Sequence, residues 1–104
     1  MPKKVTSTSK TWSGHVLLCD PLTILQVNEI EEAFGKLPKI DPKDKAFRWL
    51  AEHDLIVLPA IISCVAEWHL EGFPEKVVIE TFPGSPRSAS VDLILWLWRE
   101  IWNI

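Results

Sequence analysis

Apolar residues recur at helical spacing in one stretch of the first half of the chain. They lie three or four positions apart, as on one face of an α-helix: Ile24, Val27, Ile30 and Phe34. Thr23 precedes this stripe and Gln26 follows Thr23 by three positions, which predicts a capping box at the start of the helix. Gly35 is expected to end the helix, because glycine is favoured just after a last helical turn.

Two further helices are expected in the middle of the chain. Asp41 and Pro42 are typical of an N-cap followed by the first helical position. Residues 55–70 are strongly apolar and favour a central helix that Gly72 terminates. Pro59 fits the first turns of this helix or a kink within it, because proline cannot donate a backbone hydrogen bond.

Extended structure is expected only in short segments. Residues 12–19 are apolar and predict a strand or an extended segment, and residues 76–82 are a second candidate strand. Residues 1–11 contain Lys3, Lys4 and Lys10, no acidic residue and several hydroxyl side chains. This composition is typical of a flexible basic arm.

The last helix, over residues 91–104, has an unusually wide apolar arc. At about 100° per residue the arc covers about 200°, roughly twice the width that one core requires. Leu97 and Ile101 lie along one edge of the arc, and Trp98 and Trp102 along the other. Either the rest of the chain covers both edges, or one edge packs inward and the other contacts a partner chain. The second alternative gives six candidate partner-binding residues: Leu95, Trp96, Leu97, Trp98, Ile101 and Trp102.

These elements together predict a mainly α fold. We expect a small helical domain of about four helices, with one or two short strands in its N-terminal or middle part. Residues 12–104 would form this single domain, preceded by the arm over residues 1–11.

The charge distribution disfavours a nucleic-acid-binding surface. The 104 residues carry a net charge of -3 at pH 7. The three lysines of the arm have no acidic residue near them in the sequence, so the remaining chain is more acidic than this total. Nucleic-acid recognition needs clustered basic side chains, and nucleic acid is therefore not an expected partner.

The cysteines and the apolar runs bear on the cellular location. Cys19 and Cys64 both have apolar neighbours, which favours free, buried thiols and a reducing cytoplasm. The residues after Met1 form no apolar stretch typical of a signal peptide. The longest apolar run, over residues 55–66, has about 12 residues, fewer than the ~20 that a membrane span requires. A cytoplasmic protein without a membrane segment is expected.

Residue spacings predict neither a metal centre nor a catalytic site. His15 and Cys19 would lie about 13 Å apart on one strand, and Cys64 and His69 would point about 140° apart on a helix. Cys64 lies in the most apolar segment, where a reactive thiolate is disfavoured, and no glycine-rich phosphate loop is present. We therefore expect no enzyme activity, no cofactor and no metal.

Three blocks of the sequence resemble a known family. The blocks are Trp12–Thr23 (WSGHVLLCDPLT), Leu58–Gly72 (LPAIISCVAEWHLEG) and Phe82–Ser90 (FPGSPRSAS). Together they resemble the tail assembly chaperones, small Trp-containing proteins of long-tailed bacteriophages and prophages. The shared motifs are structural ones: a helix start, a core helix and a turn.

The resemblance implies a non-enzymatic role in the cytoplasm of the host cell. Proteins of this family bind the tape-measure protein, cover its apolar helices and assist assembly of the tail tube, with the major tail protein as a further candidate partner. The alternative is another phage or bacterial interaction module. Such a module would be an inhibitor of a host or defence protein, or a homo-oligomeric structural subunit.

Overall fold

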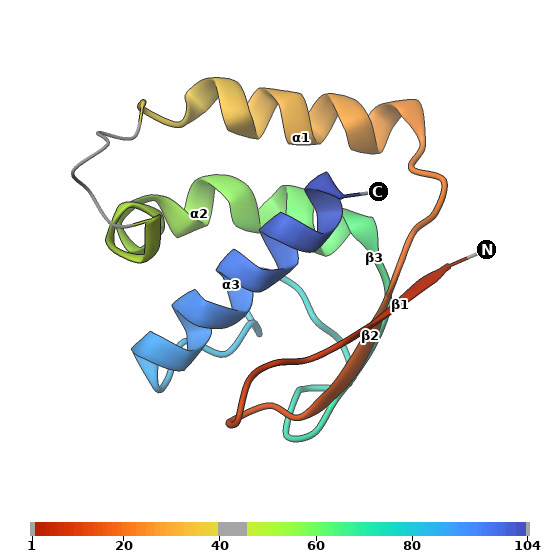
Figure 1. Ribbon diagram of the computed structural model, residues 1–104, viewed down its shortest axis with the longest axis vertical. Coiled ribbons are helices and arrows are strands. Elements are labelled where there is room, and N and C mark those ends of the chain that lie inside the picture. The colour runs from red at the N-terminus through yellow and green to blue at the C-terminus, as the bar shows by residue number, and fades with distance from the viewer. Residues whose placement is uncertain (1, 40–45, 104) are drawn as a thin grey trace.

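The computed structural model describes residues 2–39 and 46–103, in which helices and strands alternate irregularly (Figure 1). The described elements, in chain order, are β1 (Lys3–Thr6), β2 (Gly14–Leu18), α1 (Ile24–Lys36), α2 (Ala46–Cys64), β3 (Val65–Leu70) and α3 (Arg87–Trp102). The strands form one antiparallel sheet in the order β1-β2-β3. Helix α2 packs against both α1 and α3.

The prediction of a mainly α domain with about four helices is wrong. The described residues form an α+β fold with three helices and a three-stranded sheet. The main error lies at residues 65–70, which were expected to continue the apolar helix but form β3. A short apolar run is compatible with either a helix or a buried strand. In the structure β2 provides the pairing partner, with Val16 opposite Trp68.

Strand β1 lies inside the segment that was expected to be a flexible arm. Val5 pairs with Val16 of β2, and its side chain is buried in the core. Strand β2 confirms the extended segment predicted over residues 12–19. A two-stranded ribbon alone is marginally stable in water, so β1 and β3 on the two sides of β2 complete a sheet that can support a core.

Helix α1 begins as the sequence predicts. The Thr23 hydroxyl accepts a hydrogen bond from the Gln26 backbone N–H (3.2 Å), and the Thr23 N–H donates one to Gln26 Oε1 (2.8 Å). This capping box satisfies two N–H groups that otherwise lack helical partners. The helix continues one residue beyond Gly35, to Lys36.

Helix α2 joins the two helices expected in the middle of the chain. Its backbone leaves helical geometry at His53 (φ -132°, ψ 17°), and Pro59 lies in the part that follows this kink. The His53 Nδ1 atom lies 2.8 Å from the Trp49 carbonyl oxygen, which supports the chain at the kink. The helix start expected at Asp41 and Pro42 lies outside the described residues.

Residues 76–82 form turns, so the strand suggested there is wrong. The Thr81 hydroxyl donates a hydrogen bond to the Lys76 carbonyl oxygen (2.7 Å) and accepts one from the Val78 N–H (2.9 Å). These local bonds satisfy backbone groups that a strand would pair with a neighbour. In the described part of the chain, no helix has the length and apolar character needed to cross a membrane.

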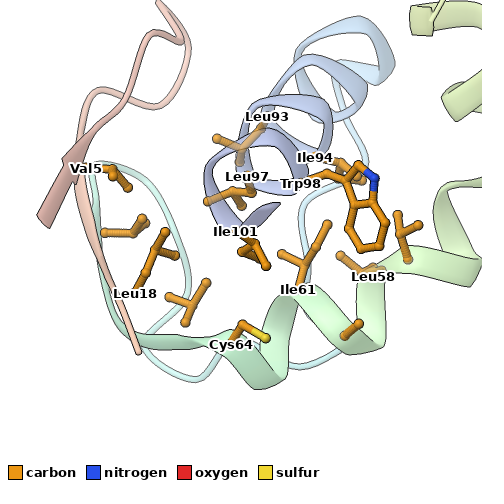
Figure 2. Packing of buried hydrophobic residues seen from close by; sticks show 14 of the residues in the cluster. Val5, Leu18, Leu58, Ile61, Cys64, Leu93, Ile94, Leu97, Trp98 and Ile101 are labelled. Atoms are coloured by element: carbon orange, nitrogen blue, oxygen red, sulfur yellow. The ribbon is translucent and has the colours of Figure 1, made fainter. Parts of the chain in front are cut away.

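Helix α3 lies between the sheet and α2 in the core (Figure 2). One edge of the helix, with Leu93 and Leu97, faces Val5 and Leu18 of the sheet. The other edge, with Trp98, faces α2. Two different layers therefore cover the wide apolar arc of α3, and together they bury most of it.

Candidate protein-interaction surface

Three of the six candidate partner-binding residues lie in the core. Leu97, Trp98 and Ile101 are all buried, with Trp98 only 8% exposed. Because the sheet covers one edge of α3 and α2 covers the other, these side chains cannot contact another protein in this conformation. Their burial agrees with the alternative in which the chain itself covers both edges.

Leu95 and Trp96 are half-buried on the side of α3 near the β1–β2 connection. They line a hollow of about 170 Å³ together with Thr8, Asp92 and Arg99. The charged neighbours distinguish this side of α3 from its apolar arc. On a helical wheel, too, Trp96 falls near the charged positions Asp92 and Arg99 and away from the arc.

Trp102 is the one of the six that is exposed, with 48% of its surface accessible. It lies at the end of α3 and contacts two other rings edge to face. Its centroid is 5.6 Å from that of Trp98 and 5.6 Å from that of Phe34 on α1. Edge-to-face contacts of this kind are attractive beyond the apolar area that they bury. Trp102 thus connects the buried edge of α3 to α1.

The apolar stripe of α1 is only partly used by the core. Ile30 and Ala33 are buried against the rest of the molecule, and Gln26 Nε2 donates a hydrogen bond to the Ser63 carbonyl oxygen on α2 (2.8 Å). Phe34 and Ile24 remain 60% and 78% exposed. Since Gln26 and Ala33 face α2, the rest of the stripe points toward α3 or the solvent.

We use the name α1–α3 surface for the exposed apolar side chains along this flank: Ile24, Val27, Phe34 and Trp102. A groove of about 160 Å³ runs through it between the two helices. The groove is lined by Leu22, Val27, Ile30, Glu31, Ile101 and Trp102. Contiguous exposed apolar side chains mark interaction sites on soluble proteins more often than isolated ones do. The chemistry of this surface suits apolar side chains projecting from a partner.

Sequence reasoning placed the surplus apolar surface on α3, whereas most of it lies on α1. The apolar spacing of α1 is nevertheless visible in the sequence, where Ile24, Val27 and Phe34 belong to one stripe. Of the four residues of this stripe, only Ile30 is buried in the core. Helical periodicity shows that a face is apolar, and only the packing of α1 on α2 shows how much of that face remains open.

Titratable side chains gather on the face of the sheet that carries His15 and His69. These residues are direct partners on β2 and β3, and Glu67 Oε1 lies 3.5 Å from His69 Nε2. Reduced hydration, the Lys4 charge and His69 lower the pKa of His15, and Glu67 partly opposes them. Among residues 2–39 and 46–103, no group of three or more His, Cys, Asp or Glu side chains is arranged to hold a metal ion.

The two cysteines meet where β2 and α2 end. Both are free thiols, and the Cys19 N–H donates a hydrogen bond to the Cys64 carbonyl oxygen (2.9 Å). Burial raises the pKa of the Cys64 thiol to about 12, with smaller contributions from Cys19 and Glu29. Cys64 is therefore a neutral core side chain at physiological pH.

The described residues define a small α+β protein that exposes several large apolar side chains, most of them on α1. No protein-family model, curated protein or solved structure matches the chain. Its α1–α3 surface is consequently the main structural basis for a functional proposal.

Proposed function

We propose that the protein is a non-enzymatic tail assembly chaperone of a bacteriophage or prophage. It binds the tape-measure protein in the cytoplasm of the host cell and shields apolar helices of this partner until the tail tube encloses them. The observation that supports this proposal is the α1–α3 surface, on which Phe34 and Trp102 remain exposed although they contact each other. The resemblance of the three sequence blocks supplies the identity of the partner.

The shape of the surface suits a helical partner. The groove beside Trp102 lies between α1 and the end of α3, so a third helix placed over it would contact two helices at once. An amphipathic helix binds in such a groove through side chains one turn apart. Exposed aromatic residues such as Phe34 and Trp102 would provide the anchors, because aromatic side chains contribute disproportionately to binding energy.

Co-expression with the tape-measure protein of the same phage or prophage tests the proposal. A tagged chaperone should co-purify with the tape-measure protein and keep it in the soluble fraction. The triple variant Val27→Ser, Phe34→Ser, Trp102→Ser should lose at least tenfold in captured tape-measure protein while retaining its circular dichroism spectrum. Its side chains are more than a third exposed, so their replacement leaves the core intact.

Leu55→Ser is the matched control for this experiment. Leu55 is an exposed large apolar residue on α2 that does not belong to the α1–α3 surface. This variant should capture the tape-measure protein as the unmodified chain does. If no complex forms with the unmodified chain, or if the triple variant captures as much as the Leu55 variant, the proposal is wrong.

The oligomeric state separates the proposal from its closest alternative. A homo-oligomeric subunit would use the α1–α3 surface to bind a second copy of the chain. Light scattering of the purified protein would then give a multiple of the 11.9 kDa chain mass, and the triple variant would give the monomer mass. The chaperone proposal expects the same mass for both proteins in the absence of the tape-measure protein.

A further inference from the structure

His15 and His69 form a cross-strand pair that neither strand alone would reveal. They are direct partners in the antiparallel register of β2 and β3. Their imidazole rings are stacked, with centroids 4.7 Å apart and planes inclined by 24°. Directly opposite side chains of an antiparallel pair point to the same face of the sheet. The side chain of His69 is 46% exposed, so this pair is accessible to solvent.

Charged side chains flank the pair of rings on the same face of the sheet. A neutral imidazole is the form of histidine that binds metal ions. Glu67 lies two positions before His69 on β3, and its Oε1 atom is 3.5 Å from His69 Nε2. The carboxylate adds negative charge beside the rings, while Lys4 of β1 opposes it with a positive charge.

We propose that His15 and His69 together bind a divalent late first-row transition metal ion such as Zn²⁺, Ni²⁺ or Cu²⁺. Imidazole nitrogen is a preferred ligand of these three ions. Metal–nitrogen bonds of about 2.0–2.1 Å to Zn²⁺ require the two rings to rotate from their stacked arrangement until one nitrogen of each meets the ion. His69 is exposed and His15 is half exposed, so neither ring is enclosed by the core.

The site differs from a structural zinc centre in its number of protein ligands. Structural zinc sites use four protein side chains, whereas this site uses two imidazoles, and water occupies the remaining positions. Glu67 is a positioning residue that attracts the ion and restrains the ring of His69. The bound ion is therefore exchangeable, and it links β2 to β3 at the end of the sheet near Gly14.

Sequence spacing alone could not reveal this pair. The spacings that could be judged from the sequence were those of His15 with Cys19 and of His69 with Cys64, and neither suits a shared ion. The alignment of His15 with His69 follows from the antiparallel pairing of β2 with β3. Because residues 65–70 were expected to be helical, no strand pairing was available to bring the two histidines together.

Titration of the full chain with ZnCl₂, and separately with NiCl₂, tests the site. Calorimetry should give one ion per chain, and the NMR signals of the His15 and His69 rings should shift together. His15→Gln and His69→Gln should each weaken binding at least tenfold. Glu67→Gln should weaken it less than either, because the carboxylate acts through charge and orientation.

His53→Gln is the matched control, since His53 is the remaining histidine and lies on α2 beside Trp49. This variant should bind the ion as the unmodified chain does, and the His53 signals should stay unchanged during the titration. The proposal is overturned if only one of the two sheet histidines responds to the ion. It is also overturned if the His15 and His69 variants, with unchanged circular dichroism spectra, bind as tightly as the His53 variant.

Discussion

Phe34 and Trp102 meet edge to face across the boundary between α1 and α3, with ring centroids 5.6 Å apart and planes inclined by 67°. Both rings nevertheless remain largely exposed. The contact therefore joins α1 to α3 at the surface while about half or more of each ring stays in water. Two aromatic rings that already meet in the free protein lose less conformational freedom when a partner binds than two separate side chains would, which favours affinity.

Trp98 and Trp102 should differ sharply in their contribution to stability. Trp98→Ala removes a buried side chain and should lower the free energy of unfolding by about 3–5 kcal/mol. Trp102→Ala should cost less than about 1.5 kcal/mol, because half of its surface already contacts water. Urea denaturation followed by circular dichroism measures both values.

Trp98→Phe makes this comparison robust if the alanine variant does not fold. The phenylalanine variant retains part of the buried ring and should be less stable than the Trp102→Ala variant. Equal stabilities of these two variants would mean that the last turn of α3 is not packed as the structure shows.

Gly14 and Gly35 provide a second matched pair. Gly14 adopts a φ of 130°, and a Cβ atom there would overlap the carbonyl oxygen of His69. Gly14→Ala should therefore cost about 2–4 kcal/mol, from backbone strain and from displacement of β3. Gly35 lies in α1, where a Cβ atom would meet nothing within 4 Å, so Gly35→Ala should raise stability by about 0.5–1 kcal/mol. Thermal unfolding of both variants should show shifts of opposite sign, and a loss of stability in both would contradict the α1 geometry.

Local sequence signals predicted the parts of the fold that short-range chemistry determines. Thr23 and Gln26 specify the start of α1 through hydrogen bonds within four residues. The apolar stripe of α1 and the wide arc of α3 were also visible from the spacing of their residues. These features depend on periodicity and capping, which are properties of a single segment.

The sheet could not be predicted in the same way. Because the predicted fold lacked the sheet, it also misjudged which side chains of α3 are free to bind a partner. Residues 65–70 become β3 because β2 is available to pair with them, and this depends on segments far apart in the chain. Without the sheet, one edge of α3 had no visible cover, so Leu97 and Ile101 remained among the candidate partner-binding residues. The structure instead places that edge against Val5 and Leu18.

The ion pair between Asp54 and Arg87 should contribute more than an exposed pair does. Asp54 is buried at the kink of α2, and Arg87 at the start of α3 donates to its carboxylate and to the Ala51 carbonyl oxygen (2.7 Å). Arg87→Met leaves the buried carboxylate without this partner, so stability should fall by about 1–3 kcal/mol. This loss of stability is smaller than the loss expected on breaking a fully buried ion pair, because the Arg87 side chain is half exposed.

Arg48→Met is the control for this measurement. Arg48 pairs with Glu52 on the surface of α2, and both side chains are well exposed. Its loss should change the free energy of unfolding by less than about 0.5 kcal/mol, as is usual for exposed pairs. If the two methionine variants unfold at the same urea concentration, the Asp54–Arg87 pair does not connect α2 to α3 energetically.

The Cys64 thiol should make the protein lose stability in alkaline solution. Burial raises the pKa of this thiol from 9.0 to about 12, so the unfolded chain releases the proton more readily than the folded chain. The contribution of the Cys64 thiol to the free energy of unfolding is fully present below pH 9 and is lost as the pH rises from 9 toward 12. Cys64→Ala should remove this part of the pH dependence, whereas Cys19→Ala should retain it.

A thiol-specific reagent should accordingly modify half-buried Cys19 in the native protein and Cys64 only as fast as the chain unfolds. Rapid modification of both thiols under native conditions would show that the junction between α2 and β3 opens without global unfolding.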